Sequence, residues 1–473
     1  MLGRNVMKNI IYNSSSLLVA NFTGLLVVIF LARALKPELF GIYSLSLSII
    51  SIFAIFADLG INNAATRYIA DAVAKNDFSL AGGYLRFLLN FKLLLTIFIF
   101  AVLLFLANSL SRVFEKPIAE PLSILSLFLL FSSIGSLFLG VANAMNDFKL
   151  NFLNYTISGV AKLFFTLLLV FLGFSLFGAI IAVVISAIFA SIFAIFYVVK
   201  NYRNLFLEKK VVEKARVFKF IAFTAVLSFS WVVFANVDMV MIGYFLKAEH
   251  VAFYRAGFSI ISAIIGLISI PAVLLPVFVR LEGEDLSKAF LRAFKYSAAL
   301  CIPSAFGTIA IAENLLFFAY GVDYLPGINA MRILSLLLIS PVFGIYGAVF
   351  SSKERPELNF YPLFLSMLLN VILNWLMIPL YGIEGAAIAT VASNVIFWTL
   401  LAIICAKNFS ILPKLEFIAK PLFCSTLMLF IAMNVGSMLL KIPISVLIYS
   451  ALLFLVKGVT KEDVDFIKEI TKI

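Results

Sequence analysis

The sequence predicts an all-α polytopic membrane protein of about 14 transmembrane helices, arranged as two pseudo-symmetric six-helix bundles plus two C-terminal helices. Composition gives the first indication: 63% of the 473 residues are hydrophobic and 13% are charged, with a mean hydropathy of +1.12. An ordinary soluble domain is about 45–50% apolar and about 25% charged, and could not bury this much apolar surface. Two further indications are a series of apolar runs along the whole chain and a sequence repeat between its halves.

The apolar runs are roughly 20 residues long, which matches the hydrocarbon core of a bilayer, about 30 Å thick. The first run is about 24 residues long and has no small-residue cleavage site, so we expect a retained span rather than a signal peptide. The last run is the shortest. In order, the expected spans are 10–34, 41–61, 86–107, 120–144, 153–173, 177–199, 218–246, 252–279, 292–312, 329–350, 361–380, 384–406, 418–440 and 443–457.

The repeat consists of two pairs of matching segments. Residues 35–51 contain Leu-Lys-x-Glu, a tyrosine and Ser-Ile-Ile-Ser, and the same pattern returns at 246–262. Residues 178–186, Gly-Ala-x-Ile-Ala-x-Val-x-Ser, return at 385–393. Both copies of the first segment lie between two apolar runs, so each includes a helix end, a short polar loop and the next helix. Many transporters place their site between two such duplicated bundles.

The longest polar stretch separates the two expected bundles and is rich in lysine and arginine. We expect an N-terminal bundle over 1–205, a cytoplasmic basic linker over 206–217 and a C-terminal bundle over 218–409. Two additional helices and a cytoplasmic tail follow over 410–473. The charges of the linker are explained by orientation and by contact with anionic lipids, with a regulatory role as the alternative.

The distribution of positive charge predicts the orientation. The net charge is +12, and most of the 36 lysine and arginine residues lie in loops that fall on one side of the expected membrane. Because cytoplasmic loops carry the excess of these residues, we expect a cell-membrane protein with both termini cytoplasmic. The alternation of basic loops also argues against a nucleic-acid partner.

Several chemistries are excluded by the sequence. Cys301, Cys405 and Cys424 lie inside apolar runs without metal-ligand or disulfide spacing, and His250 is the single histidine. There is no Gly-rich phosphate loop, HExxH motif or Ser/His/Asp constellation, and the loops are too short for a catalytic domain. We therefore expect no enzyme activity, no metal and no cofactor, and leave open a coupling ion, H⁺ or Na⁺.

Two lysines inside the expected spans are the first candidates for substrate binding. Lys162 lies roughly 14–18 Å along its helix, deeper than any other cation. Lys92 lies closer to the cytoplasmic end, with snorkelling to the interface as its alternative. Asn143 and Asn21 add polar points, for which interhelical hydrogen bonds are the alternative. Ionisable groups within membrane spans usually face a partner or a wet cavity, and the excess of lysine favours an anionic ligand.

Three further charged residues are candidates for ion coupling or gating. Asp238 and Arg255 have similar expected depths, which predicts an ion pair near the outer mouth. A structural clamp and a coupling role both remain open for this pair. Asp58, near the inner end of its span, is expected to pair with Arg67 or Lys92.

Several segments together resemble the polysaccharide-biosynthesis flippases, which include O-antigen-repeat and teichuronic-type exporters. The segments are RALKPELFGIY at 33–43, DLG at 58–60, NVD at 236–238 with the following Gly243, Tyr254 and Ala256, and LYGIEGAA at 380–387. The resemblance covers nearly the whole chain. It places the chain in the superfamily that also contains multidrug antiporters and lipid II flippases. It implies a V-shaped pair of six-helix bundles plus two helices, alternating access, and a cavity lined with cations such as Lys92 and Lys162.

The resemblance implies a flippase that moves an undecaprenyl- or dolichyl-linked oligosaccharide from the cytoplasmic to the outer leaflet. The expected partners are this lipid-linked oligosaccharide and membrane lipids. Arginine is scarcer in the expected cavity than in the lipid II branch, which disfavours a peptidoglycan precursor. The alternative is a cation-coupled drug or metabolite antiporter of the same fold, which would have an acidic cavity. A membrane-embedded glycosyltransferase is a third reading, which the short outer loops disfavour.

Overall fold

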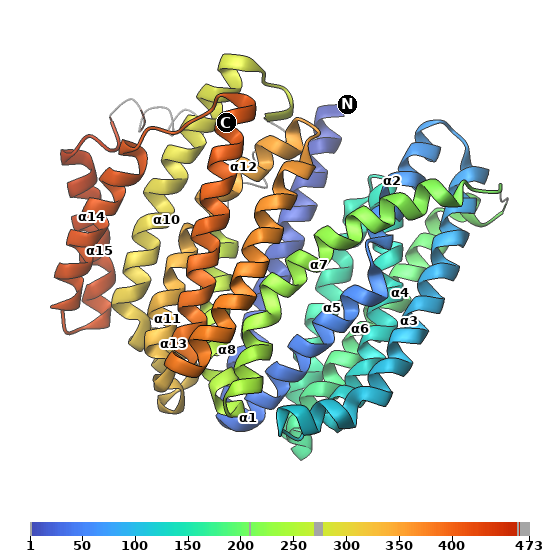
Figure 1. The fold of residues 1–473 in the computed structure, drawn as a ribbon, viewed down its shortest axis with the longest axis horizontal. Coiled ribbons are helices and arrows are strands. Elements are labelled where there is room, and N and C mark those ends of the chain that lie inside the picture. Colours follow the sequence, from blue (N-terminus) through green and yellow to red (C-terminus); the bar gives the residue numbers. More distant parts are fainter. Residues whose placement is uncertain (1, 208–209, 269–277, 461–462, 464–473) are drawn as a thin grey trace. The chain divides into compact units, whose positions relative to one another are not determined.

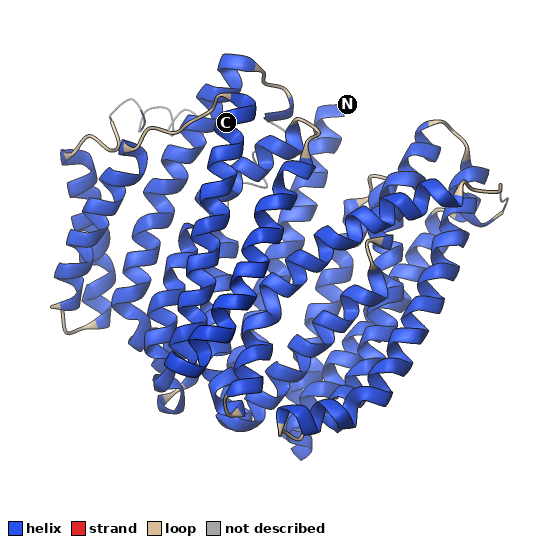
Figure 2. Cartoon of the chain, viewed as in Figure 1, coloured by secondary structure: helices blue, strands red, loops and turns tan. Residues whose placement is uncertain are grey.

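The computed structural model describes residues 2–207, 210–268, 278–460 and 463. All regular secondary structure within these residues is helical (Figure 2). The helices, in chain order (Figure 1), are α1 (Leu2–Asp58), α2 (Ile61–Ala74), α3 (Phe78–Phe114), α4 (Ala119–Ala144), α5 (Phe148–Leu169), the π-helix η1 (Val170–Phe174), α6 (Ser175–Asn201), α7 (Lys214–Phe245), α8 (Ala248–Ile268), α10 (Gly283–Tyr320), α11 (Ile328–Leu334), α12 (Ser340–Ser352), α13 (Phe360–Phe409), α14 (Glu416–Met433) and α15 (Met438–Leu455). Short 3₁₀ helices are η2 (Arg203–Phe206), η3 (Val322–Gly327), η4 (Ser335–Ile339) and η5 (Pro356–Asn359).

The helices confirm the prediction of an all-α polytopic membrane protein. Ten segments of the described chain are long and apolar enough to cross a membrane. Three of them, Leu18–Ala74, Phe148–Asn201 and Pro356–Phe409, have 54 to 57 residues and thus the length of two crossings each. A shorter apolar helix, Leu440–Leu455, completes the series. The expected eighth span agrees with α8 as far as Ile268, and residues 269–277 lie outside the described part of the chain.

The predicted boundary between the last two spans is wrong by several residues. The thirteenth span was expected to reach 440, but α14 ends at Met433 and α15 begins at Met438. The turn is polar and flexible in sequence, Asn-Val-Gly-Ser over 434–437. The Asn434 side chain donates a hydrogen bond to the carbonyl oxygen of Phe430 at 2.8 Å, and so competes with continuation of the helix. Hydropathy alone cannot place such a turn inside an apolar run.

Two of the long helices are broken at the polar turns that the sequence places there. In α1 the break falls at Lys36, whose φ of 60° and ψ of 167° are not helical. Pro37 follows, and proline removes a backbone donor and clashes with the preceding turn. In α13 the break falls at Gly382, with φ 61° and ψ −138°, a conformation that only glycine adopts without strain. Each break therefore separates two successive spans.

The two copies of the first repeat form similar local structures and pack against each other. The first copy contains the break of α1, and the second contains the junction of α7 and α8, where Leu246 is extended (φ −124°, ψ 173°). A Cβ atom on Gly41 would lie 1.9 Å from the carbonyl oxygen of Ala248. Two backbones that approach this closely need glycine at the contact, as in many membrane helix pairs.

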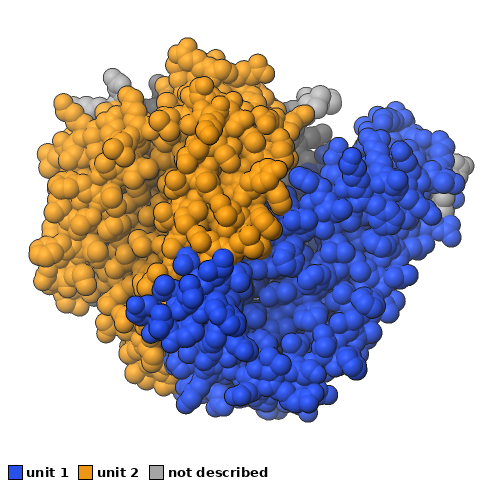
Figure 3. Space-filling model, viewed as in Figure 1, with its two compact units in different colours: residues 1–259, 371–383 blue, residues 260–370, 384–473 orange. Residues whose placement is uncertain are grey.

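The chain divides into two compact units (Figure 3). Unit 1 comprises 1–259 and 371–383, and unit 2 comprises 260–370 and 384–473. The described residues of the basic linker, 206–207 and 210–217, lie within unit 1. The α7–α8 junction packs on α1 within unit 1, because small residues permit close contact there. The predicted division of the chain into two six-helix bundles remains a prediction.

The basic linker is docked on unit 1 over its described residues. The backbone N–H of Lys210 donates to the Ser79 carbonyl at 3.1 Å, and the Lys210 ammonium lies 2.7 Å from Asp77. Gly83 provides room for this approach, since a Cβ there would lie 2.3 Å from the Lys210 carbonyl oxygen. Hydrogen bonds from Lys210 and from the Leu80 backbone hold the pKa of Asp77 below its usual value.

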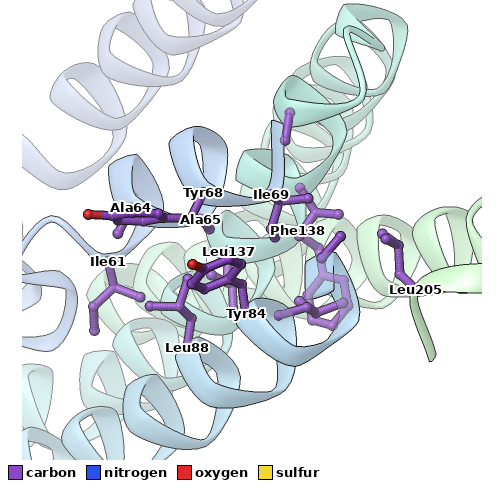
Figure 4. Packing of buried hydrophobic residues seen from close by; sticks show 14 of the residues in the cluster. Ile61, Ala64, Ala65, Tyr68, Ile69, Tyr84, Leu88, Leu137, Phe138 and Leu205 are labelled. Carbon is purple, nitrogen blue, oxygen red and sulfur yellow. The ribbon is translucent and has the colours of Figure 1, made fainter. Parts of the chain in front are cut away.

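Each unit has its own apolar core. In unit 1, Tyr68 of α2, Leu88 of α3 and Phe138 of α4 pack together (Figure 4). In unit 2, aromatic residues of α10 and α12 pack around Tyr346, with Cys405 of α13 beside them. The free cysteines Cys301, Cys405 and Cys424 are all buried in unit 2, as packed thiols would be.

Candidate functional site

The first polar cluster of unit 1 surrounds the ammonium group of Lys92. This group lies 2.6 Å from Oδ1 of Asp58, 2.6 Å from Oδ1 of Asn62 and 3.3 Å from Oγ of Ser136. The Lys92 side chain is 0% exposed, whereas that of Asp58 is 25% exposed. A buried cation is costly unless it is paired and hydrogen-bonded, and all three partners satisfy it here. Lys92 therefore does not snorkel to the surface.

Asp58 reaches Lys92 because α1 ends beside α3. The chain turns at Gly60, whose φ of 81° favours glycine, and the other carboxylate oxygen of Asp58 accepts the Gly60 N–H at 3.2 Å. The predicted pairing of Asp58 with Lys92 is thus observed. Arg67, the other predicted partner, lies over the ring of Phe220, 4.6 Å from its centroid.

Hydroxyl groups extend this cluster along α3 and α4. Oγ1 of Thr96 and Oγ of Ser133 are 2.9 Å apart, and both side chains are buried. Ser136 accepts a hydrogen bond from Asn62 at 3.0 Å. These hydroxyl residues were not among the predicted site residues. Their spacing at 92 and 96, and at 133 and 136, places each pair on one helix face and was the available signal.

The second polar cluster of unit 1 surrounds Asp238 in α7. Its carboxylate accepts hydrogen bonds from the Tyr254 hydroxyl and from Nδ2 of Asn374, each at 2.8 Å. The Asp238 side chain is buried. Neither partner was predicted, although Tyr254 belongs to the repeated segment. The expected ion pair of Asp238 with Arg255 stays a prediction.

Arg255 lies between the repeated helices. Its Nη1 lies 3.7 Å from the sulfur of Met239, which also accepts a hydrogen bond from Ser48 at 3.3 Å. Its charge interacts electrostatically with the side chains of Tyr43 and Lys162. Arg255 is therefore a neighbour of the deep lysine on α5.

Lys162 is half-buried, and its positive charge is close enough to that of Arg255 for the two to repel each other. Within the described chain, no carboxylate lies within ion-pair distance of Lys162. Two neighbouring cations inside a membrane protein attract an anion strongly, because the surroundings screen charge poorly. Lys162 and Arg255 thus form the strongest candidate for an anion contact in unit 1.

The remaining predicted substrate residues do not join Lys162. Oδ1 of Asn143 accepts a hydrogen bond from Asn151 at 2.7 Å, near the start of α5. Asn151 precedes Lys162 by three turns, roughly 16 Å along the helix. Asn21 is exposed on α1. The predicted residues therefore lie in separate places within unit 1, and Lys92 is held by Asp58 instead.

Metal binding finds no support among the residues that the structure describes. They include no group of three or more histidine, cysteine, aspartate or glutamate side chains that could hold a metal ion.

Comparison with known proteins places these features in a family context. The family model described as polysaccharide biosynthesis protein matches residues 6–282, more than half of the chain. The probable low-salt glycan biosynthesis flippase Agl15 of Haloferax volcanii is 26% identical over 196 residues, which cover 40% of this chain and 41% of that protein. The chain therefore matches less than half the length of this relative.

Solved structures share the fold. The lipid II flippase MurJ, in an inward closed conformation, is 18% identical with a TM-score of 0.75, over 94% of this chain and 98% of its own. An inward-facing multidrug resistance transporter of the MATE family is 17% identical with a TM-score of 0.65, over 83% of this chain and 94% of its own. At these identities the likeness establishes the fold.

Proposed function

Because the chain belongs to the polysaccharide biosynthesis protein family, we propose that it is a flippase that moves a lipid-linked oligosaccharide across the cell membrane. The description of Agl15 as a glycan biosynthesis flippase supports this substrate class. The observation that carries the proposal is the pair of neighbouring cations Lys162 and Arg255, inside the membrane-spanning part of unit 1. An oligosaccharide on a polyprenyl carrier is joined through phosphate or pyrophosphate, which such a pair would bind.

The two cations suit different parts of a phosphate group. The guanidinium of Arg255 can donate two parallel hydrogen bonds to phosphate oxygens, while the ammonium of Lys162 acts as a point charge. An anion bound between them would reduce the repulsion between the two positive charges. Sugar units would cross the membrane beside these cations, while the lipid tail remains in the bilayer.

A role in gating is proposed for the two polar clusters of unit 1, one with Asp58 and the other with Asp238. Asp58 is partly exposed although its partner Lys92 is fully buried, so a coupling ion would reach this ion pair from the aspartate side. A coupling ion bound at Asp58 would compete with Lys92 for this carboxylate and would favour a rearrangement of α1 against α3. Asp238, with its two hydrogen-bond donors, is the second candidate for an ion-sensitive group. Both termini are proposed to be cytoplasmic, from the distribution of positive charge.

The cation-coupled antiporter is the second candidate function, because the MATE transporter has the same fold. An antiporter for organic cations needs acidic residues at its binding site. Within the described residues, no carboxylate lies within ion-pair distance of Lys162, which favours an anionic substrate.

Reconstitution tests the proposal. Proteoliposomes would contain the protein and a fluorescent polyprenyl-pyrophosphate oligosaccharide, and an impermeant glycosidase would report the glycan that reaches the outer leaflet. We expect Lys162→Ala to lower the flipping rate at least tenfold and Lys162→Arg to retain most of it. Lys75→Ala is the matched control, because Lys75 forms an exposed ion pair with Asp71 on α2.

Full activity of Lys162→Ala would remove Lys162 from the proposed site. A wild-type protein that moves no glycan, but exchanges organic cations for H⁺ or Na⁺ in the same vesicles, would establish the antiporter instead.

A further inference from the structure

Unit 2 contains a basic cavity where α10, α14 and the end of α15 meet. Its volume is about 270 Å³, and four lysines line it together with Glu416 and Thr460: Lys295, Lys414, Lys420 and Lys457. Lys295 belongs to α10 and Lys420 to α14, while Lys414 precedes α14 and Lys457 follows α15. Two helices and two flanking segments thus bring positive charge to one place.

The carboxylates around the cavity compensate only part of this charge. Glu416 lies 3.0 Å from the Lys420 ammonium and 3.9 Å from that of Lys414. Asp463 lies 2.5 Å from the Lys295 ammonium. Within the described chain, no carboxylate is within ion-pair distance of Lys457. Among the residues that the structure describes, the four lysines therefore exceed the two carboxylates, and this excess of positive charge suits a phosphate group.

The charges of three of these lysines converge on one carboxylate. A hydrogen bond from Lys420, with the charges of Lys420, Lys414 and Lys295, lowers the pKa of Glu416. Glu416 therefore stays ionised at neutral pH and holds the lysines together.

An apolar groove adjoins the basic cavity and runs along the same helices. Its volume is about 470 Å³, and it is lined by α10 between Ala299 and Ile311, by Met428 of α14, and by α15 between Ile442 and Ser450. Ala299 lines both the cavity and the groove. The neighbouring helices are held there by the Tyr449 hydroxyl, which donates to the Ala299 carbonyl at 2.7 Å.

The groove faces outward from unit 2. Leu300 and Val446 line it and are 45% and 59% exposed. In a membrane protein such a surface is covered by hydrocarbon. The combination of a basic cavity with a continuous apolar groove matches a molecule that has an anionic head and an apolar chain.

We infer that this site binds an anionic membrane phospholipid, with its phosphate headgroup in the lysine cavity and an acyl chain in the groove of α10, α14 and α15. The lipid bridges α10 to the last two helices, which lie side by side (Figure 1). Basic residues at a membrane surface attract anionic lipids. In the proposed orientation the cavity opens on the cytoplasmic side, where the basic loops face anionic headgroups.

Thermal unfolding of the purified full-length protein in a neutral detergent tests the headgroup contact. We expect phosphatidylglycerol to raise the unfolding temperature of the wild type more than phosphatidylcholine does. The double variant Lys414→Gln, Lys457→Gln should lose this difference, because both lysines line the cavity. The double variant Lys407→Gln, Lys441→Gln is the control: it removes the same charge from unit 2 outside the cavity, and should keep the difference.

A second pair of measurements tests the acyl chain. Gly307 lines the groove, and a Cβ there would meet only the Met428 methyl group, at 4.0 Å. Gly307→Leu should therefore fold, fill the groove and remove the preference for long-chain over short-chain phosphatidylglycerol. Equal effects of both phospholipids on the wild type, or an unchanged difference in the cavity variant, would overturn the inference. The same stabilisation by inorganic phosphate would indicate a free anion, and stronger stabilisation by polyprenyl phosphate would indicate a carrier-lipid site.

Discussion

Gly41 of α1 and Ala248 of α8 bring the two copies of the repeated segment into backbone contact. A Cβ on Gly41 would lie 1.9 Å from the Ala248 carbonyl oxygen and 2.5 Å from the carbonyl carbon. The neighbouring contact is also close, because a Cβ on Gly243 would lie 2.4 Å from Cδ1 of Leu45. The duplicated sequence therefore forms an interface between two equivalent elements, and glycine sets its distance.

Replacing Gly41 by alanine should separate these helices and destabilise unit 1. Overpacking of a tight contact typically costs about 1–3 kcal/mol, and the atoms in the way belong to the backbone. Thermal unfolding in detergent measures the change. Gly24→Ala in the same helix is the control, since a Cβ there meets nothing within 4 Å. That variant should be neutral or stabilised by up to about 1 kcal/mol. Equal stability of the two variants would contradict the contact.

The ion pair of Lys92 and Asp58 predicts a strong coupling between two substitutions. Asp58→Asn leaves a fully buried ammonium group without its counter-charge and should cost about 3 kcal/mol. Adding Lys92→Met removes that charge, so the double variant should recover much of the loss. A double-mutant cycle on unfolding free energies measures the coupling. Additive losses would show that the two groups act independently.

Much of the fold could be predicted from sequence, because a bilayer requires helices of a set length. The spans follow from the apolar runs, and the breaks at Lys36 and Gly382 follow from the adjacent proline and from glycine. Lys92 was one of the two partners predicted for Asp58, with Arg67 as the other. The turn after Met433 did not, because hydropathy is nearly the same on both sides of it.

The second polar cluster of unit 1, around Asp238, could not be predicted because it depends on tertiary packing. Asn374 donates to Asp238 from a helix that lies 136 residues further along the chain. No periodicity within either helix indicates that they meet. The same holds for Lys162 and Arg255, whose proximity results from the packing of α5 near the repeated helices. The apolar runs indicate how deep each residue lies in the membrane, whereas its hydrogen-bond or ion-pair partner depends on tertiary packing.

The hydrogen bonds to Asp238 predict the effect of removing its donors. Tyr254→Phe deletes the hydroxyl that lies 2.8 Å from this buried carboxylate. Hydrogen bonds to charged groups contribute about 1.5–3 kcal/mol, so a loss in this range is expected. Tyr361→Phe is the control, because Tyr361 is 74% exposed. A neutral effect of Tyr254→Phe on thermal unfolding would show that another group satisfies Asp238.

The environment of Asp463, which lies in unit 2 outside the membrane spans, predicts that the stability of the folded state depends on pH. Burial alone would raise its pKa, but hydrogen bonds from Lys295, Thr460 and Tyr296 hold the pKa well below the usual value. A carboxyl group of this kind stabilises the folded state above its unfolded pKa of about 3.9. The stabilisation is lost as the pH falls from there toward the lower folded pKa.

The comparison of the wild type with Asp463→Asn tests this dependence. The difference in unfolding temperature should be constant from about pH 7 to pH 5 and shrink below about pH 4, because protonation then removes the charge in the wild type too. Glu284→Gln is the control, since its pair with Lys288 is exposed. A difference that grows toward acid would contradict the assignment.

We predict that replacing Lys162 by an uncharged residue changes stability and flipping activity in opposite directions. Its charge repels that of Arg255, and no described carboxylate compensates it, so it destabilises the protein when no anion is bound. Lys162→Met should raise the unfolding free energy by about 1 kcal/mol, as removal of a strained functional group commonly does. The same variant should lose flipping and any stabilisation by pyrophosphate. Lys162→Arg should keep both. A variant that is less stable than the wild type in the absence of anions would show that Lys162 is held by the fold and serves structure.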